Sequence, residues 1–421
     1  MTQHIYLVPG FFGFANLGEL RYFSHVGRFL AGCCAAAACD VRVHAVATDP
    51  TASLPRRAAR LRDAIDDGDE PIHLIGHSSG GLDVRLLATP GAVLPGGPDL
   101  ERVARRIRTV VTVSAPHHGT PVASFFASVL GQRLLQLLSL STMYVLRFGH
   151  LPLSAVLKLG GAFARVDRHL GVNSALLDQL FGLLLADFSP ARRHAIARLL
   201  GDVQNDQALL AQLTPEGMEV FNALAPNRDT VAYASVVTRG RAPGVGSTLA
   251  AGLDPTAHAT HAIYQALYRL AARTAPARHR PRLQVDQARV LRRSYEALPS
   301  LVTNDGVVPT LSQVWGDVIH AARGDHLDVI GHFDDPAHDP PHFDWLASGT
   351  GFDRPAFEAL WSAVARWVIA GAGSHARRVA HGGPSGRVHR LHPAGAGRVR
   401  RYARMARVTA RVPPRHRAGS A

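Results

Sequence analysis

The chain has 421 residues, of which 47% are hydrophobic and 19% charged, and this composition excludes a wholly disordered protein. The formal net charge of +14 is concentrated near one end. Residues 371–421 hold twelve arginines and no Asp, Glu or Lys, so the preceding 370 residues carry only +2. The charge signal of a nucleic-acid-binding domain is therefore absent from that larger part.

Cysteine spacing and the N-terminal sequence place further bounds on the class of protein. Cys33, Cys34 and Cys39 lie in one Ala-rich stretch, which predicts neither a disulfide framework nor a zinc site. The N-terminus runs directly into an apolar strand without the regions of a signal peptide. No stretch has the roughly 18 uninterrupted apolar residues of a membrane span. We therefore expect a cytoplasmic protein.

The first third of the chain alternates strand-like and helix-like stretches. Short runs rich in Val and Ile predict strands at 4–8, 41–46, 72–76 and 109–114. Stretches with helical spacing lie between them, at 20–38, 55–66 and 80–88. Strands that alternate with helices indicate an α/β fold with a mainly parallel central sheet and helices on both faces.

The pattern changes after residue 120. Residues 121–227 are rich in Leu, Ala and Phe with helical periodicity, which predicts a large helical cap or lid insertion. Residues 1–120 and 228–370 then form one α/β core, with a smaller insertion near 240–297. Further strands are expected at 230–237, 300–303 and 317–321, and a helix at 354–370. Residues 371–421, rich in Arg, Gly and Pro, are expected to be a disordered tail.

The strongest functional signal is a serine between a strand and a helix. The apolar strand is followed by Gly76-His77-Ser78-Ser79-Gly80, a G-x-S-x-G motif in the setting it requires. A tight turn there needs small residues two positions either side of the serine, and Gly76 and Gly80 supply them. The motif predicts Ser78 as nucleophile on an elbow formed with His77. The backbone N–H of Ser79, at the helix N-terminus, is an oxyanion donor.

At these residues the chain resembles the bacterial lipases and esterases of the α/β-hydrolase superfamily, such as triacylglycerol lipases. The resemblance implies the α/β-hydrolase fold. A second match is Leu7-Val8-Pro9-Gly10-Phe11-Phe12-Gly13, similar to the family loop with the other oxyanion donor, which makes the Phe11 N–H that donor. Pro9 replaces the His often found there. A third match, residues 112–121, resembles the segment leading into the lid, so His117 and His118 are expected to be structural or pocket-lining.

In this fold the chain order is Ser, acid, His, which directs the search downstream. The run Asn304-Asp305-Gly306-Val307-Val308-Pro309 resembles the family's N-D-G-x-V-P pattern and implies Asp305 as the acid. The H-L-D-V segment beginning at His326 resembles the catalytic His segment and implies His326 as the base. Asp305 would then accept the Nδ1 hydrogen, while Nε2 takes the Ser78 proton. Rival histidines lie in a Pro/Asp-rich loop: His332, His338 and His342.

Some related lipases bind a structural calcium with one ligand two residues after the catalytic His, and the resemblance puts Asp328 there. No other cofactor is expected. His332 stands where an amide ligand is expected, and Asp286 is the one upstream Asp suggested as a ligand. A nearby group lacks recognisable ligand spacing and is expected to be a solvated loop: Asp334, Asp335, His338, Asp339 and His342.

The substrate class is inferred from the helical insertion. Segments 125–130, 134–138 and 180–185 are more apolar than a surface helix requires, so they cover an acyl-binding groove, pack on one another, or do both. A hydrophobic ester or lipid is therefore the expected substrate, cleaved by a carboxylic-ester hydrolase through an acyl-serine intermediate. The alternatives are an acyltransferase or intracellular polyester depolymerase with the same triad, and a non-catalytic surface-binding protein.

The Arg-rich tail suggests an anionic partner, but Tyr402 is its one aromatic residue and no nucleic-acid module is recognisable. No specific nucleic-acid partner is therefore expected. Residues 398–412 have a helical pattern that would suit weak contact with an anionic surface. A passive, solvated tail is the favoured interpretation.

Overall fold

The computed structural model describes residues 2–380, apart from 12–21, 50, 98, 149–150, 168–173, 195, 198–207, 251–254, 274–280, 338–343 and 345. The chain divides into a compact unit of residues 1–376 and a second unit of residues 377–421. Of the second unit, the structure describes only the end of one helix.

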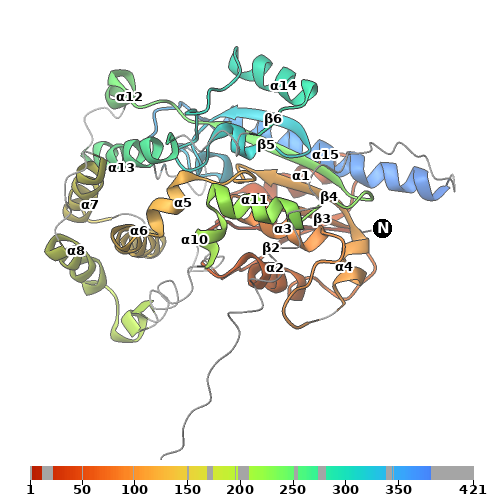
Figure 1. Ribbon diagram of the computed structural model, residues 1–421, viewed down its shortest axis with the longest axis horizontal. Helices are drawn as coiled ribbons and strands as arrows, with labels where there is room; N and C mark the ends of the chain where they lie inside the picture. Colours follow the sequence, from red (N-terminus) through yellow and green to blue (C-terminus); the bar gives the residue numbers. More distant parts are fainter. Residues whose placement is uncertain are drawn as a thin grey trace, which may run out of the picture. The chain divides into compact units, whose positions relative to one another are not determined.

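A six-stranded sheet forms the centre of the first unit, and each strand pairs with its neighbours in parallel. The strands are β1 (Gln3–Val8), β2 (Val41–Ala45), β3 (Ile72–His77), β4 (Ile107–Val113), β5 (Ala232–Arg239) and β6 (Asp317–Arg323). Their order across the sheet is β2-β1-β3-β4-β5-β6 (Figure 1). This confirms the predicted α/β class.

Alternate side chains of the strands face opposite sides of the sheet, as the period of a β-strand requires. Ile5 and Leu7 of β1 share a core with α1 (Val26–Ala36) and α15 (Arg354–Ala380). Tyr6 and Val8 share the other core with three helices. Those helices are α2 (Leu54–Asp63), α3 (Gly80–Ala88) and α4 (Leu100–Arg106). Helices therefore cover both faces, and each fully buried Leu or Ile contributes about 2 kcal/mol of hydrophobic stabilisation.

The helical insertion has a hydrophobic core of its own. Its helices are α5 (Pro121–Phe126), α6 (Val129–Phe148), α7 (Leu153–Asp167) and α8 (Ser174–Ala186). They share this core with α13 (Pro255–Ala271), which comes from the second insertion and packs against α7. The cap is thus built from two separate stretches of the chain (Figure 1). Two short helices, α10 (Ala208–Gln212) and α11 (Pro215–Leu224), contribute to a small cluster with residues of α2 and α3, and Leu210 of α10 also belongs to the core of the cap.

Four further elements lie between or after these strands and helices. They are α12 (Val245–Ala250), α14 (Val285–Tyr295), and the 3-10 helices η2 (Thr310–Gln313) and η3 (Asp328–Ile330). Strands predicted at 4–8, 41–46, 72–76, 109–114, 230–237 and 317–321 are all present, with ends shifted by at most two residues. The helix predicted at 354–370 continues to Ala380, so residues 371–380 of the expected tail are helical. Residues 381–421 lie outside the described residues.

The strand predicted at 300–303 is wrong, because these residues form a turn. The Ser300 N–H donates to Thr303 Oγ1 over 3.1 Å, and the Thr303 N–H donates back to Ser300 O over 3.2 Å. Hydroxyl side chains that bind nearby backbone groups compete with strand pairing in this way.

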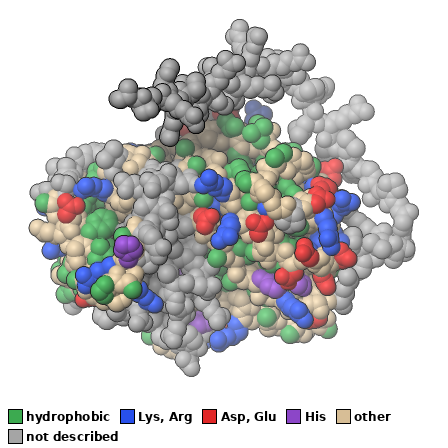
Figure 2. Space-filling view, turned by 90° about the horizontal axis from the view of Figure 1, so that it is seen from below, with side chains coloured by type: hydrophobic (Ala, Val, Ile, Leu, Met, Phe, Trp, Pro, Cys, Tyr) green, Lys and Arg blue, Asp and Glu red, His purple; other side chains and the backbone are tan. Residues whose placement is uncertain are grey.

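Acidic and basic side chains lie next to one another on the face shown in Figure 2. Ion pairs on the surface of the first unit include Arg105 with Glu101 and Arg354 with Glu358. Mixed charge of this kind suits a solvated surface. Within the described part of the chain, every helix is too short or too polar to span a bilayer.

Candidate active site

The predicted nucleophile lies on a strained turn between β3 and α3. Ser78 has a φ of 55°, in the left-handed region that non-glycine residues rarely adopt. A Cβ on Gly76 would lie 2.2 Å from Gly80 O, and a Cβ on Gly80 would lie 2.3 Å from Val8 O. Because these neighbours are backbone atoms, both positions require glycine. The turn has the geometry of a nucleophile elbow, and strain of this kind is typical of functional sites.

One predicted oxyanion donor, Ser79, follows this serine in the chain, and the loop of the other, Phe11, packs against it. Ser79 is the N-cap residue of α3, and the first N–H groups of a helix have no partner within the helix. Phe11 is half-buried and follows Gly10, where an added Cβ would lie 2.6 Å from the Cβ of Ser78. The loop that carries Phe11 is therefore in close contact with the serine, as the proposed role requires.

A buried ion pair holds the loop that carries Phe11 in place. Arg57 of α2 and Asp83 of α3 are completely buried, and the Arg57 Nη2 donates to Asp83 Oδ2 over 2.8 Å. The same nitrogen donates to Pro9 O over 2.9 Å and to Gly10 O over 3.3 Å. Burial raises the pKa of Asp83 to about 6, against the opposing effect of the Arg57 charge. The two helices thus fix the backbone immediately before Phe11.

The predicted acid, Asp305, is completely buried and its carboxylate accepts five hydrogen bonds. Oδ1 accepts from the backbone N–H groups of Val307 (3.0 Å) and Val308 (2.7 Å). Oδ2 accepts from His326 Nδ1 (2.9 Å), from the Thr238 hydroxyl (2.8 Å) and from Gln313 Nε2 (3.1 Å). These five donors fix the orientation of the carboxylate.

The predicted base, His326, follows β6 and is held by Asp305 at two places. Its backbone N–H donates to Asp305 O over 2.9 Å, and its Nδ1 donates to the Asp305 carboxylate over the same distance. A neutral imidazole with its proton on Nδ1 has an unprotonated Nε2 that can accept one. The side chain is 6% exposed, which keeps this pair away from bulk water.

The structure joins the serine turn to the acid–base pair through His77. The His77 Nε2 donates to His326 O over 2.9 Å, and the two imidazole rings are 4.7 Å apart between centroids. Ser78, the Phe11 loop, Asp305 and His326 therefore gather beyond the carboxyl ends of β3, β1, β5 and β6. Ligand sites of parallel α/β sheets lie at this edge.

Three acidic residues next to His326 form a candidate cation site. One carboxylate oxygen from each of Asp325, Asp328 and Asp344 lies within 4.8 Å of the others. Asp325 and Asp328 are buried, and burial is the main cause that raises the pKa of each well above its usual range. The Asp325 Oδ2 is buried without a hydrogen-bond partner among the described residues. An oxygen-only set with an unsatisfied oxygen fits calcium.

The cluster includes neither Asp286, the upstream Asp suggested as a ligand, nor His332, which stands where an amide ligand is expected. The exposed Asp286 is on α14 and pairs with Arg289, while His332 donates from Nε2 to Tyr22 O over 3.1 Å. The cluster therefore agrees with the prediction for Asp328 only. Asp325 and Asp344 were missed because their separation in sequence matches no ligand pattern. Of the Pro/Asp-rich loop, residues 338–343 lie outside the described residues.

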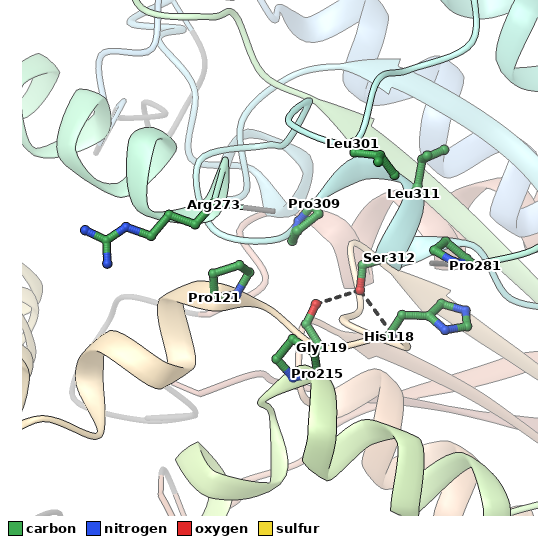
Figure 3. A pocket seen from close by; sticks show the side chains of 10 residues that line it. All are labelled: His118, Gly119, Pro121, Pro215, Arg273, Pro281, Leu301, Pro309, Leu311 and Ser312. Carbon is green, nitrogen blue, oxygen red and sulfur yellow. Dashed lines mark hydrogen bonds between the residues drawn. The ribbon is translucent and has the colours of Figure 1, made fainter. Parts of the chain in front are cut away.

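His117 and His118 have the kind of positions predicted for them. His117 is completely buried; its Nδ1 accepts from Arg85 over 3.0 Å and its Nε2 donates to the Thr112 hydroxyl over 2.9 Å. His118 lines a cavity of about 40 Å³, beside Pro121 and Ser312 (Figure 3). Its backbone N–H donates to Ser312 Oγ, which donates to Gly119 O. None of the residues lining this cavity belongs to the predicted triad.

Five supporting residues were missed from the sequence: Tyr22, Arg57, Asp83, Thr238 and Gln313. Most of their partners are far away in the chain, as in the 55-residue separation of Tyr22 from His77, although Gln313 is only eight residues from Asp305. The one local signal is that the mainly apolar helix after the serine carries two charged residues, Asp83 and Arg85. A charge on a buried helix indicates a buried partner.

The all-parallel sheet with a serine elbow after β3, a buried aspartate after β5 and a histidine after β6 is the arrangement of the α/β-hydrolase fold. The chain resembles the bacterial lipases and esterases, as the sequence predicted. A triacylglycerol lipase from Pseudomonas fragi is 33% identical over 122 residues, or 28% of this chain. The match spans 36% of that lipase, about a third of its length. No protein-family model matches the chain.

The solved structures that this chain resembles at low sequence identity include bacterial lipases. EstA from Clostridium botulinum has a TM-score of 0.49 and 18% identity, covering 87% of each chain. Lipase 1 from Pelosinus fermentans has a TM-score of 0.49 and 16% identity, covering 87% of this chain and 98% of its own. The Staphylococcus hyicus lipase has a TM-score of 0.46 and 14% identity, covering 89% and 97%.

Proposed function

We propose that this chain is a carboxylic-ester hydrolase that uses Ser78 as its nucleophile, His326 as its base and Asp305 as the acid that orients the base. The observation that supports this most directly is the buried 2.9 Å contact between Asp305 and His326 beside the strained serine turn. A buried carboxylate that orients an imidazole next to an elbow serine is the arrangement required for activating a hydroxyl.

The reaction follows from these positions. His326 Nε2 removes the Ser78 proton as the hydroxyl oxygen attacks the ester carbonyl. The charge that develops on the carbonyl oxygen is stabilised by the N–H groups of Phe11 and Ser79. His326 then returns the proton to the leaving alcohol, which leaves an acyl-serine. A water molecule, deprotonated by the same imidazole, releases the acid and restores Ser78.

The apolar cap supports a hydrophobic ester as substrate. Phe11 of the oxyanion loop and Leu327, next to the base, both pack against the hydrophobic core of the cap. Apolar side chains therefore continue from the cap to the residues on either side of the reacting centre. Such surroundings favour an apolar acyl chain over a small or charged one. The similarity to a triacylglycerol lipase points to the same substrate class.

We further propose that Asp325, Asp328 and Asp344 hold a calcium ion. When bound, the ion would supply positive charge to carboxylates that otherwise lack a cationic partner among the described residues. Asp328 also accepts from the backbone N–H of Asp325, so the ion would hold together the loop on both sides of His326. This role is structural, and no step of the reaction passes through the ion.

A fluorophosphonate probe tests the catalytic proposal, because it reacts covalently with activated serines. We expect the full chain to be labelled on the peptide that contains Ser78, and labelling to be lost in Ser78→Ala and His326→Ala. Ser128→Ala, an exposed serine of the cap, is the matched control and should be labelled as strongly as the native chain. Labelling that persists in Ser78→Ala would move the nucleophile to another residue.

A second measurement distinguishes a hydrolase, which transfers the acyl group to water, from an acyltransferase, which transfers it to an alcohol. With a p-nitrophenyl ester and increasing alcohol, a hydrolase forms mainly free acid, whereas an acyltransferase forms mainly the new ester. A dominant ester product at low alcohol concentration would replace hydrolase by acyltransferase and leave the triad unchanged. Equal binding to anionic vesicles or granules by native chain and Ser78→Ala, without any labelling of the native chain, would instead support the surface-binding alternative.

A further inference from the structure

A continuous chain of hydrogen bonds connects the oxyanion loop to His326. It passes through His77, the residue before the nucleophile Ser78. The Gly10 N–H donates to the Tyr22 hydroxyl oxygen over 2.8 Å. That hydroxyl is 2.7 Å from His77 Nδ1, and His77 Nε2 is 2.9 Å from His326 O. Gly10 immediately precedes Phe11, and His77 immediately precedes Ser78. The hydrogen bonds therefore link residues next to Phe11 and Ser78 to His326, which are the proposed oxyanion donor, nucleophile and base.

The direction of every bond in this chain is determined. A carbonyl oxygen can only accept, so the proton of His77 must be on Nε2. Burial lowers the pKa of His77 well below its usual value, so the ring is neutral and its Nδ1 can only accept. The Tyr22 hydroxyl therefore donates to Nδ1, and its oxygen is free to accept from Gly10. Both ring nitrogens of a completely buried His77 are satisfied in this single arrangement.

Two of the linked residues, Tyr22 and Gly10, are held by further hydrogen bonds. The backbone carbonyl of Tyr22 accepts from His332, beyond the base loop, and Gly10 O accepts from Arg57. A Cβ on Gly10 would lie 2.7 Å from the Tyr22 hydroxyl and 2.6 Å from Ser78 Cβ, so the loop has no room to move inward. The position of the oxyanion loop is therefore set by these hydrogen bonds and by its contact with Ser78.

We propose that His77 and Tyr22 are positioning residues that fix the oxyanion loop and the carbonyl of His326 at set distances from Ser78. This inference rests on the proposed function, because it gives these residues their role through Ser78 and His326. In catalysis the base acts on the Ser78 hydroxyl while the oxyanion donors bind the carbonyl oxygen that this hydroxyl attacks, so an error in their spacing affects the transition state more than substrate binding.

The alternative is that His77 only fills space, and two substitutions separate the two roles. Gln carries a donor and an acceptor about as far apart as the two ring nitrogens, so His77→Gln can donate to His326 O and accept from Tyr22. His77→Leu fills similar volume without either bond. Positioning predicts that Gln retains turnover and Leu does not. Space filling predicts the reverse, because an apolar side chain suits a buried site better than an amide.

Steady-state kinetics on p-nitrophenyl butyrate test the proposal. We expect kcat to fall about 100-fold in His77→Leu, as for an error of about 1 Å in a reacting group, with KM changed less than twofold. His77→Gln should stay within about fivefold of the native kcat, and Tyr22→Phe should lose about tenfold. Because Tyr22 and His77 act through the same series of hydrogen bonds, Tyr22→Phe should lower kcat little further in the His77→Leu background. Native kcat in His77→Leu and Tyr22→Phe would overturn the proposal.

Two matched controls separate positioning from a general loss of stability. His73→Leu removes a buried histidine of the same strand, bonded to Thr109 and Gln3. Tyr295→Phe removes a buried hydroxyl that donates to Val237 O and Ala322 O. Both should lower the melting temperature and leave kcat unchanged. A fall in kcat in the controls equal to that in His77→Leu would show a structural role only.

A measurement without turnover checks the bond directions independently. In protein labelled with ¹⁵N-histidine, the His77 ring should show a protonated Nε2 and an unprotonated Nδ1, assigned by comparison with His77→Gln. A proton on Nδ1 would overturn the proposed chain even if the enzyme is active. A native chain that neither hydrolyses the ester nor reacts with fluorophosphonate would refute the proposed function instead. Should His77→Leu not fold, Tyr22→Phe with native kcat would overturn the inference.

Discussion

Replacing Asp305 with Asn gives a sharp test of the acid, because it removes the charge and exchanges one oxygen for an NH2 group. The new NH2 has two possible positions. At the place of Oδ1 it would face the N–H groups of Val307 and Val308, leaving buried donors without an acceptor at roughly 1–3 kcal/mol each. That orientation is therefore disfavoured.

At the place of Oδ2 the NH2 group is tolerated better, because the neighbouring donors have other acceptors. The Thr238 hydroxyl can turn to Gln313 Oε1, 2.9 Å away, and Gln313 Nε2 is 3.2 Å from Val308 O. His326 Nδ1 must then accept from the Asn, which transfers the ring proton to Nε2. With that nitrogen protonated, the imidazole cannot take the proton of Ser78.

We therefore expect Asp305→Asn to fold and to lose most of its activity. The free energy of unfolding, measured by urea denaturation, should change by about 1 kcal/mol. The value of kcat should fall about 10⁴-fold, as expected for a triad histidine in the wrong tautomer, which corresponds to about 5 kcal/mol of transition-state stabilisation. Ester hydrolysis by the folded variant within tenfold of native kcat would refute the assignment of Asp305.

Other perturbations test separate parts of the structure. Gly76→Ala places a Cβ 2.2 Å from a backbone oxygen, so we expect a loss of unfolding free energy of about 1–3 kcal/mol or more, together with loss of fluorophosphonate labelling; a labelled, equally stable variant would contradict this close packing. Chelation of calcium should lower the melting temperature of the native chain and leave that of Asp328→Asn nearly unchanged, whereas equal shifts would remove Asp328 as a ligand. Trp361→Ala empties a completely buried site and frees Val329 O, so unfolding free energy should fall by about 3–5 kcal/mol in urea denaturation, and a loss under 1 kcal/mol would contradict the packing described for α15.

The local parts of the site could be predicted from the sequence. The strand, turn and helix around Ser78 are consecutive in the chain, and the glycines that the close packing requires are visible in the motif. Strand positions followed from runs of Val and Ile, since the sheet is buried on both faces. Asp305 and His326 were found through chain order and family resemblance, and their 2.9 Å contact spans 21 residues of sequence.

The supporting contacts could not be predicted, because they join residues with no common pattern. Gln313 reaches Asp305 and Thr238 only because η2 packs beside the end of β5. Hydrophobic periodicity predicted that cap helices exist, but it carries no information on which helices pack together. For the same reason the sequence predicted an insertion near 240–297 but not that α13, which lies within it, shares the hydrophobic core of the cap.

The contribution of α13 to the cap has a consequence for exchanging substrate preference between related enzymes. Transplanting residues 121–227 alone would leave Tyr264 and the other apolar side chains of α13 facing a foreign surface. A graft must therefore carry both stretches of sequence to retain a complementary interface. Because two separate stretches of sequence form the cap, four backbone connections join it to the core instead of two. These connections restrict the cap to smaller rotations than a single insertion with one hinge would allow.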